Sequence, residues 1–228
     1  MKYTEDTSTK YNNIGIKGTT YSIAFYKLLS LILLLEKPSG EMLDFGTGTG
    51  RLIRLLKEYF TNIVFLGADK SKNMLANLPN FAKTIYLESN KLPLGNETIS
   101  FITITSVLEE IKTKEDLSNI FAEFRRVLKK ESRLYIILAN PDAIKNNCHF
   151  YSYSFVSDRN IKDSETYQCI SSLPNFSFKD TFWSKETIMD LLIANSFKVR
   201  KVITPKGKKN ANFALRDEKK IAPDIIIV

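Results

Sequence analysis

The chain has 228 residues, of which 43% are hydrophobic and 25% charged, a composition typical of one soluble globular domain. Its net charge of +8 favours anionic partners, yet no dense block of Lys and Arg with interleaved aromatic residues marks a nucleic-acid interface. The two cysteines lack metal or redox spacing, and the longest apolar run is too short to cross a bilayer. The polar N-terminus has no apolar signal core, so we expect a cytoplasmic protein without membrane contact. With one histidine and scattered carboxylates we expect no metal site, and we expect a monomer or homodimer.

Up to residue 140, helical patterns alternate with short β-branched runs. In chain order the pattern predicts a helix over 21–35, a strand over 41–45, a glycine turn over 46–50, a helix over 51–60, a strand over 62–68, a helix over 71–78, strands over 83–87 and 99–105, a helix over 114–130 and a strand over 134–139. This alternation predicts a parallel sheet covered by helices on both faces. In such sheets the ligand binds beyond the carboxyl ends of the strands.

The alternation ends after Asn140. Residues 141–183 are polar and aromatic, and we interpret them as a lid inserted over an acceptor site. A helix over 184–195 and strands over 197–204 and 221–228 follow, the last of them antiparallel and at the sheet edge. The prediction is a single α/β domain over 1–228, with a Rossmann-like, seven-stranded, mostly parallel sheet and an antiparallel last strand.

A glycine-rich turn, Asp44 to Gly50 (DFGTGTG), closes the first predicted strand. The dinucleotide fingerprint G-x-G-x-x-G requires a third glycine where this chain has Arg51, so the spacing disfavours a dinucleotide. A tight turn without a ligand is the simpler alternative. Asp69 follows the second strand, where a carboxylate accepts hydrogen bonds from the ribose hydroxyls of an adenosine group. Asp44 either pairs with an ammonium group of the ligand or caps the turn.

Several motifs together resemble those of the class I S-adenosylmethionine-dependent methyltransferases. They are MLDFGTGTG over 42–50, GADKS over 67–71, YLESNKLPL over 86–94, FITITSVLEEI over 101–111 and VLKKESRLYIILANPD over 127–142. The resemblance implies S-adenosylmethionine as the cofactor and S-adenosylhomocysteine as the product. It implies that the cofactor is held by Asp44, Gly46, Thr47, Gly48, Gly50, Asp69, Lys70, Glu88, Ser89 and Ser106. We further expect a Cβ atom at Gly46 or Gly48 to clash with the cofactor or to forbid the backbone angles.

The start of the chain narrows the resemblance. YNNIGIKGTTY, over 11–21, is similar to the leading segment of a bacterial, type 11-like subgroup of these methyltransferases. This implies that residues 1–35 form an arm and a helix over the cofactor site, with Thr19 and Thr20 near the methionine end. An arm that only covers the sheet is the alternative.

No motif singles out a catalytic residue. Candidates for a general base are His149, Glu109 and Tyr11, although a lone histidine is more often structural or exposed and Glu109 could simply begin a helix. The expected walls of the acceptor pocket are Tyr11, Tyr21, Glu109, Tyr151, Tyr153 and Trp183, each of which could instead belong to the core.

The acceptor is the least determined part. Methyltransferases that act on bases often carry Asn, Asp or Ser before Pro-Pro-aromatic after the fourth strand, whereas this chain has Thr105-Ser106-Val107-Leu108. We therefore expect methyl transfer to oxygen or nitrogen of a small molecule. The alternatives are an RNA methyltransferase that uses the basic C-terminal third, and a catalytically silent module that only binds the cofactor.

Overall fold

A computed structural model describes residues 9, 15–36, 39–89, 91–172, 175–208 and 211–228. Its elements are α2 (Tyr21–Leu35), β1 (Gly40–Phe45), α3 (Arg51–Lys57), β2 (Ile63–Asp69), α4 (Lys72–Leu75), β3 (Lys83–Tyr86), β4 (Ile99–Thr105), η1 (Leu108–Glu110), α5 (Lys114–Val127), β5 (Leu128–Ala139), α6 (Pro141–Lys145), β6 (Tyr153–Val156), β7 (Thr166–Ser172), β8 (Asn175–Thr181), α7 (Lys185–Ala194), β9 (Val202–Ile203), η2 (Asp217–Lys219) and β10 (Asp224–Ile227). Among the described residues, no helix has the length and apolar character needed to span a membrane.

The main sheet has seven strands in the order β3-β2-β1-β4-β5-β10-β9. Strands β1 to β5 pair with one another in parallel, and β10 is antiparallel to both β5 and β9. This confirms the predicted α/β fold with an antiparallel last strand. The expected edge position of that strand is wrong, because β10 lies between β5 and β9 and all four of its residues are buried.

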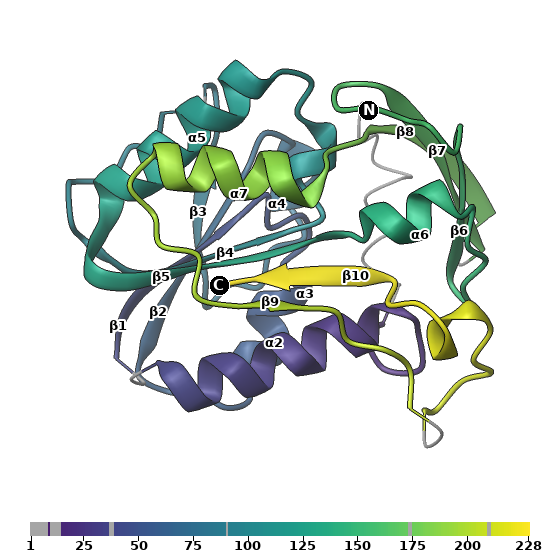
Figure 1. Ribbon diagram of the computed structural model, residues 1–228. Helices are drawn as coiled ribbons and strands as arrows, with labels where there is room; N and C mark the ends of the chain where they lie inside the picture. The colour runs from purple at the N-terminus through teal and green to yellow at the C-terminus, as the bar shows by residue number, and fades with distance from the viewer. Residues whose placement is uncertain (1–8, 10–14, 37–38, 90, 173–174, 209–210) are drawn as a thin grey trace.

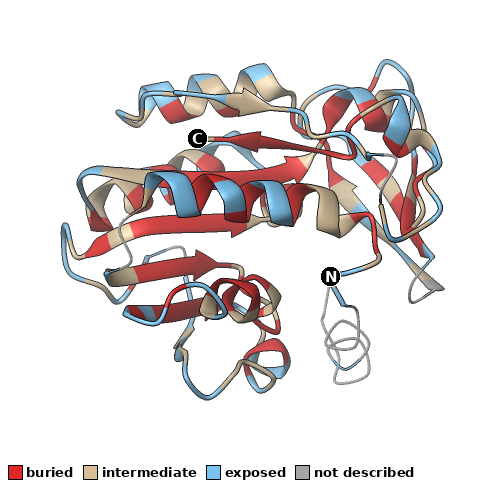
Figure 2. Cartoon of the chain, turned by 90° about the horizontal axis from the view of Figure 1, so that it is seen from below, coloured by how far each residue is buried: buried red, intermediate tan, exposed pale blue. Residues whose placement is uncertain are grey.

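Helices cover both faces of this sheet (Figure 1). Helices α2 and α3 pack on one face around Leu28, Ile32 and Leu56, and α5 and α7 pack on the other around Phe121 and Ile188. Figure 2 shows the central strands buried along most of their length, while each helix keeps an exposed outer side. This two-sided burial explains why the strands read as continuous apolar runs.

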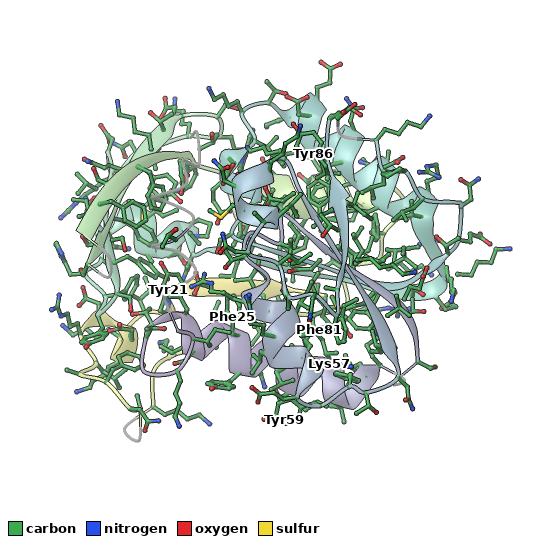
Figure 3. The ribbon with its side chains drawn as sticks, turned by 180° about the vertical axis from the view of Figure 1, so that it is seen from behind. Tyr21, Phe25, Lys57, Tyr59, Phe81 and Tyr86 are labelled. Carbon is green, nitrogen blue, oxygen red and sulfur yellow. The ribbon has the colours of Figure 1, made fainter. Side chains whose placement is uncertain are left out.

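The ends of the elements follow local rules. Helix α2 has the predicted bounds, and the side chains of Thr113 and Ser184 accept backbone hydrogen bonds at the starts of α5 and α7. Lys57 Nζ, on α3, lies 5.6 Å from the centre of the Phe81 ring, so a cation–π contact joins α3 to the segment before β3. Both residues are labelled in Figure 3.

Residues 141–182 form α6 and a second, three-stranded antiparallel sheet in the order β6-β7-β8. This small sheet lies beyond the carboxyl ends of the parallel strands, on the right in Figure 1. It has its own apolar cluster, which includes Phe150, Phe155 and Phe182. The segment that we interpreted as a lid therefore contains a short helix and a small sheet beyond the carboxyl edge of the main sheet.

Candidate functional site

A cavity of about 360 Å³ lies at the carboxyl edge of β1, β2 and β4. Its walls come from the glycine turn, the ends of these strands, η1, the small sheet and β10. Of the residues predicted for cofactor or acceptor, the cavity is lined by Tyr21, Asp44, Gly46, Thr47, Gly48, Asp69, Lys70, Glu88, Ser89, Ser106, Glu109 and Tyr153. The strand order reverses between β1 and β4, so the cavity lies where open α/β sheets bind ligands.

The three glycines of the turn have positive φ angles but different surroundings. A Cβ atom at Gly46 would lie 2.2 Å from Val107 Cγ2, and one at Gly50 would lie 2.7 Å from Leu78 Cδ1. A Cβ atom at Gly48 meets nothing within 4 Å. Packing within the protein therefore also excludes a side chain at Gly46 and Gly50, and the φ angle of 68° at Gly46 agrees with the expectation that the backbone angles forbid a Cβ atom there. Gly50 is not a lining residue, and Gly48 is the glycine that opens into free space in the cavity.

Asp44 is buried at the end of β1 and holds the turn in place. Its Oδ1 accepts a hydrogen bond of 2.7 Å from Thr103 Oγ1, and its Oδ2 accepts one of 2.8 Å from Thr47 Oγ1. Burial raises the pKa of this carboxyl group to about 6, although the two hydroxyl donors oppose the shift. Both carboxylate oxygens thus tie β4 and the turn to β1, and a second lone pair on each remains for a ligand.

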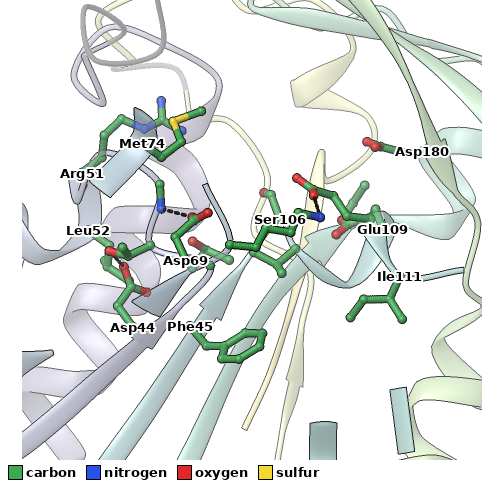
Figure 4. Close-up of a pocket in the computed structure, with 18 of the residues that line it drawn as sticks. Asp44, Phe45, Arg51, Leu52, Asp69, Met74, Ser106, Glu109, Ile111 and Asp180 are labelled. Atoms are coloured by element: carbon green, nitrogen blue, oxygen red, sulfur yellow. Dashed lines mark hydrogen bonds and ion pairs between the residues drawn. The ribbon is translucent and has the colours of Figure 1, made fainter. Parts of the chain in front are cut away.

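Asp69 ends β2 with its carboxylate beside the turn. Its Oδ2 accepts a hydrogen bond of 2.8 Å from the Gly48 N–H, and its Oδ1 accepts one of 2.8 Å from the Ser71 N–H. Burial raises the pKa of Asp69, and the two backbone donors oppose the shift. The carboxylate therefore fixes the position of Gly48 while one edge of the group faces the cavity (Figure 4).

Arg51, the first residue of α3, also lines the cavity. Its guanidinium lies 4.9 Å from the ring centre of Tyr21 and 5.8 Å from that of Phe25, two neighbours on α2 that Figure 3 labels. The buried Nη1 has no hydrogen-bond partner among the described residues. This unpaired donor makes Arg51 a candidate for holding an anionic group of a ligand.

The other end of the cavity is acidic. Glu109 on η1 is 5% exposed, and its Oε1 accepts a hydrogen bond of 2.7 Å from the Ala139 N–H. Asp180 on β8 and Asp224 on β10 line the same cavity. Figure 4 places Glu109 and Asp180 on the side opposite Arg51 and Asp69. One cavity thus has two chemically different ends.

Burial raises the pKa of each of these three carboxyl groups. The pKa rises to about 7 for Glu109, about 8 for Asp180 and about 7 for Asp224. The negative charge of Glu109 adds to the shifts of Asp180 and Asp224, whereas the Tyr153 hydroxyl, which donates to Asp224, opposes the shift there. These groups therefore change charge near neutral pH.

This has a consequence for stability. A carboxyl group whose pKa is raised by folding binds its proton more tightly in the folded state than in the unfolded state. The protonated group therefore adds to the free energy of unfolding. This contribution is full below the unfolded pKa of about 4 and is lost as the pH rises through the folded pKa. We expect the melting temperature of the ligand-free protein to decrease as the pH rises from about 5 to 8.5. Asp180→Asn is expected to flatten this slope, and the exposed Glu115→Gln to leave it unchanged. Thermal unfolding followed by circular dichroism measures it, and an equal slope in Asp180→Asn would contradict the assignment.

The two threonines predicted near the methionine end, Thr19 and Thr20, do not line the cavity, whereas Tyr21 does. Thr20 is buried, its Oγ1 donates a hydrogen bond of 2.8 Å to Glu218 Oε1, and its N–H donates to Ser152 Oγ. Thr19 Oγ1 donates 2.7 Å to the Ile16 carbonyl oxygen. Neither threonine lines the cavity, and both join the N-terminal segment to itself or to the small-sheet region and η2. Tyr11 and most of the leading segment lie outside the described residues.

Three further predicted residues also lie away from the cavity lining. His149 is exposed, and its N–H donates to Asp217 Oδ2. Tyr151 packs on Phe213 with ring centres 5.2 Å apart. Trp183 is 2% exposed, and its Nε1 donates at 3.1 Å to the carbonyl oxygens of Leu108 and Ile111. Trp183 therefore holds the backbone on both sides of Glu109 and helps to position that residue.

Many lining residues were not predicted. Those that bear on the chemistry of the site include Arg51, Phe155, Tyr167, Cys169, Phe178, Asp180 and Asp224. Phe178 and Asp180 lie two residues apart on β8, so an alternating pattern in 175–181 was the available signal. An acidic residue at the start of the apolar run of β10 was the signal for Asp224.

Comparisons with known proteins find similarity to methyltransferases. Residues 43–136 match the model of a methyltransferase domain. Over 110 residues the chain is 31% identical to the ubiquinone/menaquinone biosynthesis C-methyltransferase UbiE of Desulfotalea psychrophila, covering 46% of this chain and 44% of that protein. Over 125 residues it is 30% identical to the demethylmenaquinone methyltransferase of Thermotoga maritima, covering 53% of each. The chain thus spans about half the length of the curated relatives it matches.

The fold is shared over the whole chain. A crystal structure of an S-adenosylmethionine-dependent methyltransferase from Aquifex aeolicus superimposes with a TM-score of 0.64 at 16% identity, covering 99% of this chain and 97% of that one. The matched domain and the shared fold support the class I methyltransferases as the group that the motifs resemble, and they imply S-adenosylmethionine as the cofactor. The N-terminal segment 11–21 lies outside the matched region.

Proposed function

We propose that the chain is an S-adenosylmethionine-dependent methyltransferase that acts on oxygen or nitrogen of a small-molecule acceptor. The observation that carries the proposal is the continuity of one cavity from the open face of Gly48 to the buried carboxylate of Glu109. The first end suits a nucleoside cofactor, and the second suits a polar acceptor. The small sheet supplies the wall between the acceptor and solvent.

The residues at the first end fit this cofactor. The space in front of Gly48 admits a ligand close to the backbone, and the free lone pairs of Asp69 suit two ribose hydroxyls. The unpaired Nη1 of Arg51 suits the carboxylate of the methionine part, and Glu88, which is exposed at the cavity rim, suits the adenine amino group. When bound, S-adenosylmethionine supplies an electrophilic methyl group on a sulfonium sulfur, and the C–S electron pair stays on sulfur when that group leaves.

The chain itself contributes position, dryness and a proton acceptor. Aromatic side chains of β6, β7 and β8, among them Phe155 and Phe178, cover the acceptor end and keep water away. Glu109 faces this end with a pKa near 7, the range in which a carboxylate accepts a proton from an acceptor N–H or O–H group. His149 and Tyr151 take no part in this account because they lie away from the cavity lining.

The RNA alternative is less well supported. The basic groove of about 340 Å³ is lined by Arg125, Lys130, Arg133, Lys198 and Arg200. These residues gather around the beginning of β5, at the end of the sheet opposite the cavity. A nucleic acid bound there would not bring a base to Glu109.

Turnover tests the proposal directly. The protein is incubated with S-adenosylmethionine and a panel of amines, phenols and alcohols, and S-adenosylhomocysteine is quantified by mass spectrometry. We expect product with at least one class of acceptor, and a strong decrease of product in Asp69→Asn when the concentration of S-adenosylmethionine is limiting. Product methylated only at carbon, or S-adenosylmethionine binding with no turnover on any member, would contradict the oxygen or nitrogen assignment and favour a C-methyltransferase or a silent binding module.

A further inference from the structure

The acidic end of the cavity contrasts with the rest of the molecule. The chain carries a net charge of +8, yet Glu109, Asp180 and Asp224 meet there from η1, β8 and β10. The basic residues in the lining are Arg51 and Lys70. Arg51 lies at the other end (Figure 4), and Lys70 Nζ pairs with Glu110 Oε2 at 2.5 Å. Among the described residues that line the cavity, no Lys or Arg side chain is therefore left to pair with the three carboxyl groups.

Glu109 has an unused acceptor that points to a ligand. Its side chain is 5% exposed, and Oε1 is engaged with the Ala139 N–H. The buried Oε2 has no hydrogen-bond partner among the described residues. Leaving a buried carboxylate oxygen unpaired is costly, and a donor in the cavity would remove that cost. This is an acceptor site that the fold leaves open for a ligand.

Aromatic rings line the same cavity. They are those of Tyr21, Phe25, Phe45, Tyr153, Phe155, Tyr167 and Phe178. Tyr153 lies at the acidic end, where its hydroxyl donates to Asp224, and Tyr21 lies beside Arg51. A cation beside such rings is attracted to their faces, whereas a neutral hydroxyl group gains much less and an anion is repelled. Carboxylates and aromatic rings that surround one space are the combination that binds organic ammonium ions.

The titration of the cluster agrees with this arrangement. Burial and like charge raise the pKa values of Glu109, Asp180 and Asp224 to about 7 or 8. Other titratable groups that act on the cluster or line the same space are Glu110, Cys169, Tyr21, Tyr153 and Tyr167. The cations are Lys70 and Arg51 in the lining, and the amino terminus, whose positive charge opposes the rise in the pKa of Asp180. A bound cation lowers these pKa values, so its binding releases protons near neutral pH.

We propose that the acceptor is an amine, which enters as its ammonium ion and donates an N–H hydrogen bond to Glu109 Oε2 beside Asp180. One N–H proton then passes to Glu109 Oε2, which becomes a neutral carboxylic acid and leaves the amine neutral with a free electron pair. That pair is the nucleophile for methyl transfer, and the proton on Glu109 later passes to solvent. The inference rests on the methyltransferase function proposed above and narrows its acceptor to nitrogen.

A metal ion is the competing occupant of an acidic cluster. Among the described residues, no group of three or more His, Cys, Asp or Glu side chains has the arrangement of a metal site. The aromatic lining also favours an organic cation over a hydrated metal ion. Metal binding is therefore made an outcome of the test.

The test measures binding to the intact protein saturated with S-adenosylhomocysteine. The probes are matched sets with one skeleton and three head groups: phenethylamine, phenethyl alcohol and phenylacetate, then cyclohexylamine, cyclohexanol and cyclohexanecarboxylate. Calorimetry at pH 7 in phosphate gives the affinity, and a pH indicator in weakly buffered solution without any amine buffer gives the protons released. We expect the amine of at least one set to bind with proton release, and its alcohol and carboxylate to bind at least about tenfold more weakly.

Variants place the binding at the cluster. Glu109→Gln and Asp180→Asn are expected to weaken amine binding on the order of thirty-fold, because each removes one charge from a desolvated ion pair. Their affinity for S-adenosylhomocysteine should stay near that of the parent protein, which also shows that they are folded. Glu115→Gln, an exposed carboxyl group of α5, is the matched control and should change neither affinity.

The outcomes separate the two proposals. Absence of S-adenosylhomocysteine binding would overturn the methyltransferase function and this inference with it. Cofactor binding without any amine binding, or equal binding of an alcohol, would overturn the inference alone. Magnesium or zinc ions that compete with the amine and lose affinity in Glu109→Gln would identify a metal site instead and overturn it as well.

Discussion

Gly48→Val is expected to abolish binding of S-adenosylmethionine while the chain stays folded. Gly48 lines the cavity, and the position of its absent Cβ atom is free of protein atoms within 4 Å. A valine there would place its methyl groups in the space that we assign to the cofactor. Isothermal titration measures the affinity, and circular dichroism shows whether the fold is retained.

Backbone strain has to be separated from this effect. Gly48 has a φ angle of 56°, so any side chain there costs on the order of 1–3 kcal/mol of strain. Gly18→Val is the matched control, because Gly18 has a φ angle of 75°, has its nearest neighbour atom 3.9 Å from a Cβ position and does not line the cavity. Both variants should lose similar stability, and only Gly48→Val should lose binding. Retained binding in Gly48→Val would mean that the turn does not cradle the cofactor.

Asp69→Asn should weaken cofactor binding by roughly 10- to 100-fold, the effect of losing charge-assisted hydrogen bonds. The amide can accept a hydrogen bond through one side only, so it cannot serve the Gly48 N–H, the Ser71 N–H and two ribose hydroxyls together. The affinity for S-adenosylhomocysteine is the quantity to measure.

Asp69→Asn also alters a local turn contact, and this effect has to be separated from the loss of cofactor contacts. Asp69 Oδ1 accepts from the N–H two residues later, and Asp158 Oδ1 does the same with Asn160 at 2.7 Å on an exposed turn. Asp158→Asn therefore removes the same type of turn contact far from the cavity lining and should not change the affinity. An Asp69→Asn protein that binds as tightly as the parent would remove Asp69 from the site.

Where contacts are local, the sequence was a sufficient guide. The bounds of α2 and β4 match the prediction at both ends, because each is a continuous pattern with clear limits. The predicted strand over 134–139 begins six residues earlier, at Leu128, and Glu131 within it has a φ angle of 60°. The charged residues near the start of β5 gave no strand pattern, and the pairing of that part with β4 is irregular, with a register shift between Ile99 and Phe101.

The local hydrophobic pattern could not predict how distant strands pair. The predicted strand over 197–204 is reduced to Val202–Ile203, and β10 lies inside the sheet. Nothing in the run Asp224–Ile227 distinguishes an edge strand from one buried between two others. Its full burial depends on β9, which arrives from a different part of the chain.

The difference between local and non-local contacts also explains which site residues could be predicted from the sequence. The cofactor end is built from contiguous motifs, so Gly48 and Asp69 could be identified from spacing. The acidic end joins Glu109, Asp180 and Asp224, which are far apart in sequence and meet only through the small sheet and β10. Of these three, Glu109 was predicted, because it directly follows a strand of the main sheet.

The central claim is that this cavity binds S-adenosylmethionine. Isothermal titration of the parent protein with S-adenosylmethionine, S-adenosylhomocysteine and NAD, in parallel and under one buffer, tests it most directly. The account predicts micromolar binding of the first two and no binding of NAD. Binding of NAD alone would contradict it, because the position of Arg51 would then not exclude a dinucleotide and the reaction class would have to change.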